Sequence, residues 1–253
     1  MKNYNFLLIL FIVSIFYSCQ NEYQQPDKLT DVCFYTSFFR NKNLNSSLNQ
    51  FSVFTDLSQG ALSHRWEVSE GCQLMEGAIS AKETVFTKYF VPGLVSTQNT
   101  INVLYTKGGN QTIRLYNTFA DSVTFRGAKL APAKKNGNVW VMDTTITVHV
   151  YVDIVPEYKI TQNEVDVAAN QDTIFVAKNG SLKFTDLTTI GEPLGRKWSV
   201  AGMTNTTTVA TFVFKIPGIY NATLTSTRAA NVDLNIPGSS KTITLKPIIK
   251  VLP

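Results

Sequence analysis

Residues 144–155 read TTITVHVYVDIV, and this stretch decides the fold class. Apolar side chains occupy every second position of it, at Ile146, Val148, Val150, Val152 and Ile154. Successive side chains of a β-strand point to opposite faces, so a period of two residues is typical of a strand with one face buried. The stretch therefore predicts a long strand that packs one face on a core and turns the other to solvent.

The chain contains two copies of one pattern, and the alternating stretch closes the first copy. Three blocks recur in the same order: FTDL at 54–57 and 184–187, RWEV at 65–68 and KWSV at 197–200, and GNQTIRL at 109–115 and GIYNATL at 218–224. A second alternating run, at 241–251, closes the second copy. Self-similarity of this kind indicates two structural repeats in tandem.

The remaining segments also favour strands, because no window of useful length has the period of a helix. Pro247 interrupts the last run, and since proline lacks a backbone N–H it marks a sheet edge or a bulge there. Many short strands at this spacing are typical of β-sandwiches. We predict an all-β chain of two sandwiches, 30–156 with insertions and 157–253, which meet near Pro156 without a flexible linker.

Three blocks of the second copy resemble the PKD-like branch of the immunoglobulin-like β-sandwiches. They are Phe184-Thr185-Asp186, Trp198-Ser199-Val200 and Pro217-Gly218-Ile219-Tyr220, in that order. The resemblance implies two tandem immunoglobulin-like (PKD-like) domains. Both copies depart from the family at its Gly-Asp-Gly segment, with VSEG at 68–71 and VAG at 200–202, so no role of that aspartate is carried over.

Five residues of the repeats are expected to be structural: Trp66, Trp198, Phe54, Phe184 and Gly218. A tryptophan at the same position of each copy is expected to bury a large area between two sheets. Gly218 follows a proline and allows a turn geometry that is closed to other residues.

The N-terminus has the pattern of an export signal. Lys2 precedes an apolar run at 6–16, which is followed by Ser18-Cys19. The run is too short for a helix that crosses about 30 Å of hydrocarbon. Ser18-Cys19 resembles the lipobox of bacterial lipoproteins, which implies a signal peptide at 1–18 and lipid attachment at Cys19. The alternative is an ordinary secretory signal with an incidental cysteine.

The polar segment after Cys19 predicts the location of the folded part. Residues 19–29 contain a proline and no apolar period, as in a flexible lipidated tether. Glu22 and Asp27 resemble the acidic tethers of surface lipoproteins in the Bacteroidetes, which implies an outer-membrane anchor with the protein facing outward. Three Asp-Ser/Thr-apolar triplets, centred on Ser122, Thr144 and Thr173, resemble O-glycosylation sites of that lineage.

Two cysteines remain beyond the lipid site, Cys33 and Cys72. Two cysteines in an oxidising compartment can pair, but free cysteine is also a common small residue of protein cores. The sequence leaves the disulfide and the two free thiols equally open.

The sequence shows no catalytic set, cofactor site or metal site. The two histidines, His64 and His149, have no partner at ligand spacing, and there is no phosphate-cradling glycine loop or metalloprotease motif. The net charge is +5, and the basic cluster at Arg126, Lys129, Lys134 and Lys135 is expected to be a solvated loop. We therefore expect neither an enzyme nor a nucleic-acid-binding protein.

The remaining hypothesis is a glycan-binding or adhesive module. Aromatic side chains that could stack on sugars are Trp140, Tyr116, Tyr151, Tyr89 and Phe90. Trp140 directly precedes the Thr144 strand, so ordinary strand packing is its alternative role. The expected partners are the membrane, through Cys19, and a polysaccharide or an envelope protein. The alternative function is a structural spacer or an assembly subunit of an envelope complex, including the fimbrial type.

Overall fold

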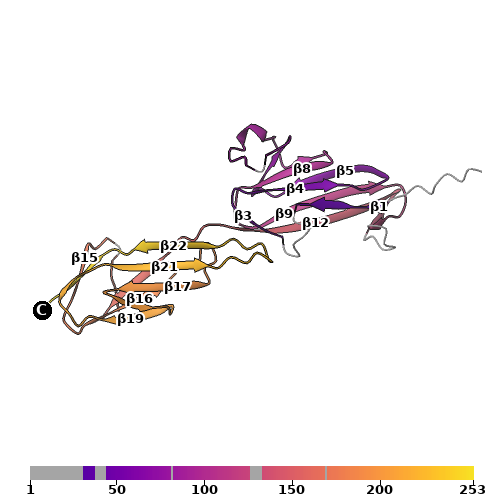
Figure 1. The fold of residues 1–253 in the computed structure, drawn as a ribbon. Coiled ribbons are helices and arrows are strands. Elements are labelled where there is room, and N and C mark those ends of the chain that lie inside the picture. The colour runs from indigo at the N-terminus through magenta and orange to yellow at the C-terminus, as the bar shows by residue number, and fades with distance from the viewer. Residues whose placement is uncertain (1–30, 38–43, 81, 126–132, 169) are drawn as a thin grey trace, which may run out of the picture.

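The computed structural model describes residues 31–37, 44–80, 82–125, 133–168 and 170–253. Within these residues the chain is all-β, apart from a single 3₁₀ turn, η1 (Thr87–Tyr89). Figure 1 shows two bodies placed end to end, the first drawn in indigo to magenta and the second in orange to yellow. The prediction of an all-β chain with two sandwiches is confirmed.

The first sandwich consists of two main sheets and one strand pair. One sheet is antiparallel, in the order β2 (Phe34–Thr36), β4 (Phe51–Asp56), β8 (Thr100–Tyr105) and β6 (Cys72–Met75). The other has the order β11 (Lys134–Asn136), β12 (Val139–Tyr151), β9 (Gly109–Phe119), β5 (Ala61–Val68) and β7 (Val95–Ser96), with β3 (Asn45–Ser47) parallel to β12. The pair consists of β1 (Asp31–Val32) and β10 (Thr124–Phe125).

The second sandwich has the same plan with fewer strands. Its first sheet has the order β14 (Val165–Asp166), β13 (Tyr158–Gln162), β16 (Ser181–Asp186) and β19 (Val209–Val213). Its second has the order β18 (Met203–Asn205), β17 (Gly195–Val200), β21 (Ala222–Arg228) and β22 (Ser239–Thr244). A third small sheet is made of β15 (Thr173–Val176), β23 (Ile248–Val251) and β20 (Gly218–Tyr220).

The strand order identifies both bodies as immunoglobulin-like sandwiches. In each, the strand carrying the Phe-Thr-Asp block (β4, β16) pairs with β8 or β19, while the tryptophan strand (β5, β17) pairs with β9 or β21 in the opposite sheet. This division of strands, with a buried tryptophan between the sheets, defines the immunoglobulin arrangement.

The two repeated tryptophans form the centre of each core. Trp66 and Trp198 are both 0 % exposed. Each packs at an angle on the phenylalanine of its own repeat, with ring centroids 6.1 Å apart for Phe54 and 5.7 Å for Phe184. The Nε1 of Trp198 donates to the Thr207 carbonyl at 3.0 Å, whereas the Nε1 of Trp66 has no partner in the described part of the chain.

A tyrosine closes the second sandwich at the turn before β21. The hydroxyl of Tyr220 donates to the carbonyl of Ile216 at 3.0 Å, which is the tyrosine corner of immunoglobulin-like domains. A Cβ at position 218 would lie 3.2 Å from this hydroxyl, and the φ of Gly218 is +156°. The turn therefore favours glycine at position 218 both for space and for backbone conformation.

Two predicted segments are divided differently in the structure. The last alternating run is split at Pro247 into β22, which pairs with β21, and β23, which pairs with β15 and β20. Lys134 and Lys135, predicted to lie in a loop, form the exposed strand β11 against β12. Arg126 and Lys129 lie outside the described residues.

Cys33 and Cys72 are both free, so the disulfide alternative is wrong. Cys33 directly precedes β2 and Cys72 begins β6, at opposite edges of a sheet in which β4 and β8 lie between them. Three strand spacings amount to roughly 14 Å, whereas a disulfide needs Cα atoms about 4–7 Å apart. Burial raises the pKa of the Cys72 thiol, which keeps it protonated and unreactive.

Candidate functional site

The two sandwiches meet at the loop between β21 and β22, residues 229–238. Asn45, at the start of β3, donates from its side-chain Nδ2 to the Leu234 carbonyl at 2.6 Å. Asn235 in turn donates from its Nδ2 to the Asn45 carbonyl. On β12, His149 Nε2 lies 2.7 Å from Glu192 Oε1, and its Nδ1 lies 2.8 Å from Asn110 Oδ1. Side chains of both sandwiches therefore fix the junction.

Arg228 is a buried charged residue at this junction, with 4 % of its surface exposed. Its Nε donates to the Pro237 carbonyl at 2.8 Å, and its Nη1 donates to the carbonyls of Val152 and Gly191. Its guanidinium carbon lies 4.6 Å from the ring centroid of Tyr151. One side chain of the second sandwich thus contacts the end of β12, the connecting segment and its own loop, which restricts movement between the domains.

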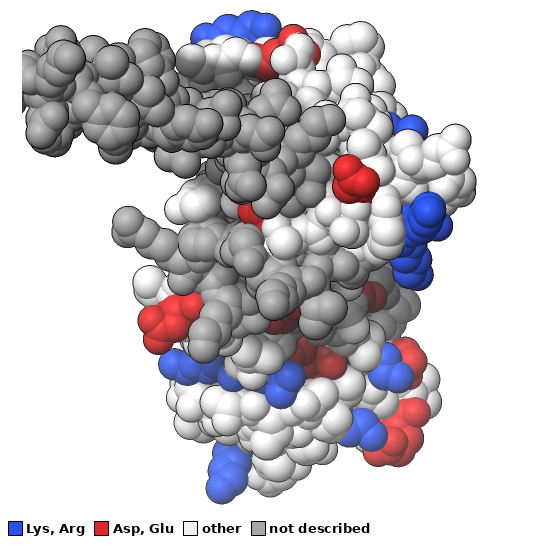
Figure 2. Space-filling model, turned by 90° about the vertical axis from the view of Figure 1, so that its right-hand side faces the viewer, with Lys and Arg blue, Asp and Glu red and all other residues white. Residues whose placement is uncertain are grey.

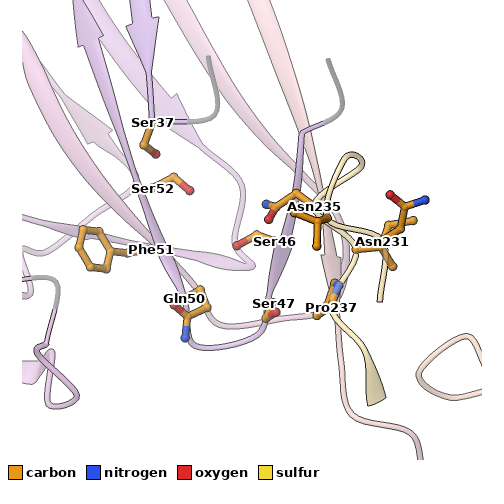
Figure 3. Close-up of a pocket in the computed structure, with 11 residues that line it drawn as sticks. Ser37, Ser46, Ser47, Gln50, Phe51, Ser52, Asn231, Asn235 and Pro237 are labelled. Atoms are coloured by element: carbon orange, nitrogen blue, oxygen red, sulfur yellow. The ribbon is translucent and has the colours of Figure 1, made fainter. Parts of the chain in front are cut away.

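A cleft of about 520 Å³ opens beside this junction (Figure 3). Its first wall belongs to the first sandwich and its second wall to the β21–β22 loop. The lining side chains carry hydroxyl or amide groups and no formal charge, with a few apolar neighbours: Ser37, Ser46, Ser47, Gln50, Phe51, Ser52, Asn231, Val232, Asn235, Ile236 and Pro237. The hydroxyl groups of the first wall therefore lie opposite Asn235, whereas the Asn231 amide turns away from them in Figure 3 and its Oδ1 accepts from the Leu234 N–H at 3.0 Å.

Three polar side chains of the first wall, those of Ser46, Ser47 and Gln50, are available to a ligand. In Figure 3, Ser46 and Ser52 point into the space between β3 and β4, and both are more than nine-tenths buried. The side chains of Ser46, Ser47 and Gln50 make no hydrogen bond to any described residue. None of the three carries a buried unsatisfied atom, since Ser47 is half-buried and Gln50 is exposed, so their polar groups can be reached from the cleft.

Phe51 connects this cleft to a second hollow on the other side of β4. Its ring points away from Ser52 in Figure 3 and meets Phe86 edge-on, with centroids 5.6 Å apart. The second hollow has a volume of about 650 Å³ and shares Gln50 and Phe51 with the first. Phe90, 41 % exposed, also lines it. The aromatic wall comes from the long insertion between β6 and β7.

The rim of the second hollow holds an ion pair that satisfies its own charges. Lys88 Nζ lies 2.6 Å from Glu83 Oε2, and the backbone N–H groups of Thr84 and Val85 donate to Glu83 Oε1. The hydrogen bond from Lys88, followed by that from Val85, lowers the pKa of Glu83 to about 2. Tyr89 donates to the same carboxylate at 3.3 Å, so this predicted ligand residue orders the loop instead of facing the hollow.

The structure brings together only part of the predicted aromatic set. Phe90 lies at the second hollow, and Tyr89 is beside it. Tyr151 lies at the junction, covered by Arg228 and by His149, whose ring centroid is 4.7 Å away. Trp140 is half-buried and packs on the small apolar cluster of Val32, Phe119, Val123 and Met142, which is the strand-packing role.

Tyr116 lies apart from both hollows, on the outer face of the β12-β9-β5 sheet. The guanidinium groups of Arg65 and Arg114 lie 4.7 and 5.6 Å from its ring centroid. Arg114 also makes 2.7 Å contacts to Glu67 and Asp143, and its hydrogen bonds lower the pKa of both carboxyl groups. The charges of this face are paired internally. On the face shown in Figure 2, basic and acidic side chains are likewise interspersed.

The three predicted glycosylation positions differ in access. Ser122 is exposed, whereas Thr144 and Thr173 are half-buried within β12 and β15. Thr144 lies on the same face of β12 as the buried Met142 and Ile146, so a sugar there would have to enter the sandwich. Of the three, Ser122 is the one whose side chain is exposed to solvent. Cys19 lies outside the described residues.

No group of three or more His, Cys, Asp or Glu side chains within the described ranges could hold a metal ion. Among those residues no helix is long and apolar enough to cross a membrane. His64 lies 3.9 Å from Asp56 and contacts the Thr97 carbonyl at 2.6 Å, and His149 belongs to the junction.

Sequence patterns did not indicate the residues that line the cleft. Ser46, Gln50 and Asn231 lie in polar stretches that resemble any surface turn. The unequal length of the two copies indicated the insertion that carries Phe86 and Phe90. No sequence pattern indicated that the short loop with Asn231 and Asn235 contributes to a cleft.

Comparison with known proteins leaves the family open. No family model matches the chain, and no curated protein matches it. Among solved structures it is similar to the N-terminal four Ig domains of Dscam1 isoform 6.9, with 12 % identity, 90 % of this chain and 47 % of that chain covered, and a TM-score of 0.41. The chain spans about half the length of the Dscam chains that it matches.

Two further solved structures are also similar. One is the C-terminal fragment of intimin in complex with the intimin-binding domain of its translocated receptor, with 10 % identity, 85 % and 63 % coverage, and a TM-score of 0.36. The other consists of fibronectin(III)-like modules of Clostridium thermocellum CbhA, with 11 % identity, 87 % and 94 % coverage, and a TM-score of 0.28. At TM-scores this low, the strand order of the chain, and not these likenesses, identifies its fold.

Proposed function

We propose that the protein is a non-catalytic binding module that holds a saccharide chain across the cleft between its two sandwiches. The observation that carries the proposal is the cleft itself, where uncharged hydroxyl and amide side chains of two domains line one space. Polysaccharides present many hydroxyl groups and few charges, and a lining of this kind can donate to them and accept from them.

The second hollow supplies the complementary kind of contact. Phe51, Phe86 and Phe90 present aromatic surface beside the polar cleft, and the apolar face of a sugar ring can pack on such a surface. Because Gln50 and Phe51 line both hollows, a ligand that fills the two must be extended and must pass over the β3–β4 turn. An oligosaccharide of several units meets that requirement, whereas a monosaccharide fits only one hollow.

The binding function is tested by retardation of the purified protein in gels that contain defined neutral polysaccharides. A double variant, Ser47→Ala with Gln50→Ala, removes two side chains without partners and should weaken binding about tenfold or more. Thr147→Ala, an exposed change on the outer face of β12, is the matched control. If no polysaccharide of a broad panel retards the wild-type protein, the saccharide proposal is wrong.

Anchoring at the membrane is a separate part of the proposal. The N-terminal pattern supports export, with lipid attached at Cys19 and the tether at 19–29 holding the sandwiches at the outer face of the outer membrane. Two or more acyl chains bind a bilayer durably, whereas a single chain binds it marginally. Cys19→Ala should release the folded protein from membranes, and protease treatment of intact cells should digest only the anchored form if it faces outward. Retention of the Cys19→Ala protein in membranes would contradict this part.

A spacer or assembly role, including the fimbrial type, is the second candidate, and the junction favours it. Arg228 and the asparagine contacts fix two rigid bodies end to end, as a spacer requires. A spacer needs the junction but not the side chains of the cleft. If variants of the cleft abolish the function of the protein at the cell surface while the junction stays intact, the binding role is favoured. If only variants of the junction abolish that function, the spacer role is favoured.

A further inference from the structure

The two sandwiches differ at one sheet edge. In the first, β8 lies between β4 and β6, so both of its edges are paired. In the second, the equivalent strand β19 pairs with β16 and ends the sheet. The second sandwich therefore lacks the strand that β6 supplies in the first, and its place beside β19 is empty of any described strand.

The backbone of β19 offers regular hydrogen-bonding groups along this edge. The carbonyl of Thr208 accepts from Asp186 and the N–H of Phe214 donates to Gly180, so even-numbered residues face β16. In an antiparallel ladder the alternate residues then face outward. These are Val209, Thr211 and Val213, and among described residues only the Thr207 hydroxyl reaches this edge, at the Val209 carbonyl.

The side chains of β19 do not protect the edge. The strand reads VATFV, without charge or proline, and Val209 and Val213 are 49 % and 42 % exposed. Natural edge strands are blunted by charged residues, prolines or bulges, because an unpaired flat strand recruits another strand. Two cations lie close to the strand: Lys215, exposed two residues after its end, and Lys183 on the neighbouring β16, which is paired with Glu164 at 2.7 Å.

We propose that β19 pairs with β19 of a second copy of this chain, antiparallel, about a two-fold axis at Thr211. The β6–β8 pair of the first sandwich shows the antiparallel orientation. In the symmetric register Thr211 lies opposite Thr211, and Val209 lies opposite Val213. Threonine pairs and pairs of β-branched apolar residues both stabilise antiparallel strands, and no like charges meet. The strand is therefore complementary to itself.

The symmetry fixes how the two copies are arranged. The strands of the second sandwich run roughly along the line that joins the two domains (Figure 1). A two-fold axis across β19 reverses that direction, so the first sandwiches lie at opposite ends of the pair. A five-residue edge makes a small interface, and the dimer is expected to be weak, with a dissociation constant of about 100 µM.

Analytical ultracentrifugation of the full chain tests the pairing, with charged residues of either sign introduced at Thr211 on the two-fold axis. The wild-type mass should rise towards that of a dimer with concentration, while Thr211→Lys and Thr211→Glu should each remain monomeric because like charges face each other. An equimolar mixture of the two variants should restore the dimer, which shows that both fold. Thr242→Lys, on the opposite edge strand β22, should dimerise as the wild type does. A monomeric wild type, or a dimer that survives in both Thr211 variants, would overturn the proposal.

Cross-linking gives the register. Opposite residues in a hydrogen-bonded antiparallel pair have Cα atoms about 5.5 Å apart, which suits a disulfide. Thr211→Cys, in a chain that carries Cys19→Ser and Cys33→Ser, should form a disulfide-linked dimer on mild oxidation, and Thr242→Cys should not. Equal cross-linking of the two variants would overturn the assigned axis.

Discussion

Arg228 of the second sandwich lies against Tyr151 at the end of β12 in the first, with 4.6 Å between the guanidinium carbon and the ring centroid. A cation above an aromatic face is stabilised by the ring quadrupole, and more so when water is excluded. Because Arg228 also donates to backbone carbonyls on both sides of the junction, it helps to fix the orientation of the two domains, together with the contacts of Asn45 and His149. The cleft exists only while that orientation is kept.

Replacing Arg228 by methionine should therefore loosen the junction. The change leaves buried carbonyl groups without a donor and should lower the free energy of unfolding of the second sandwich by about 2–3 kcal/mol. It should also broaden the distribution of interdomain angles, measured by small-angle scattering or by residual dipolar couplings. Lys197→Met, an exposed cation of β17, is the control. Unchanged interdomain order in Arg228→Met would contradict the role assigned to this residue.

The repeated tryptophans allow a matched comparison. Trp198 donates a hydrogen bond to Thr207, whereas the indole N–H of Trp66 has no described partner. Phenylalanine removes the N–H and some volume at both sites, so the packing cost is similar and only Trp198→Phe loses a hydrogen bond. We expect Trp198→Phe to cost about 1 kcal/mol more than Trp66→Phe in denaturant unfolding. Equal costs would mean that Trp66 has a partner, such as a buried water.

The aspartates of the repeats suggest a stabilising substitution. Arg196 Nε lies 2.7 Å from Asp186, and at the same position of the first sandwich His64 lies 3.9 Å from Asp56. Asp56 is 6 % exposed and already accepts from Ser58 and Asn117. His64→Arg should give the first sandwich the direct pair of the second and raise its unfolding free energy by about 1 kcal/mol. Destabilisation at neutral pH would show that the two environments are not equivalent.

The paired charges around Arg114 predict a pH dependence. Hydrogen bonds from Arg114 lower the folded-state pKa of Glu67 from 4.5 and of Asp143 from 3.8. A lowered carboxyl pKa stabilises the folded state at all pH values above the unfolded pKa, and the contribution is lost as the pH falls through the folded pKa. Both groups are partly exposed, so the loss below about pH 4 should be only about 0.5–1 kcal/mol.

Urea unfolding of the first sandwich at pH 7 and at pH 3 measures this effect. In Arg114→Met the difference in unfolding free energy between the two pH values should shrink by that amount. Lys134→Met, an exposed cation of β11 on the same sheet, serves as the control. An identical pH dependence in Arg114→Met and the wild type would contradict the assignment.

The sequence was sufficient for the fold class because burial follows its periodicities. The alternation of Ile146, Val148 and Val150 predicted a strand with one buried face, and all three residues are buried in the structure. The repeated tryptophans were predicted to lie in the two cores, and both do. The exact strand ends were less predictable, since β12 begins at Val139 and the last run breaks at Pro247.

The candidate site could not be predicted because its two walls are distant in the sequence. Ser46 and Asn231 meet only through the order of the strands and the orientation of the junction. Aromatic content was a poor guide for the same reason, since pattern alone does not separate Trp140, which packs on an apolar cluster, from Phe90, which lines a hollow. Cys33 and Cys72 remained ambiguous because strand order decides their distance.

Mapping of a bound neutral oligosaccharide by amide chemical shifts tests the central proposal most directly. A titration that moves the resonances of Ser46, Gln50 and Asn231 together, and that loses this response in the Ser47→Ala, Gln50→Ala double variant, is the predicted result. Shifts confined to the outer face around Tyr116, or binding unaffected by the double variant, would contradict the assignment of the cleft as the binding site.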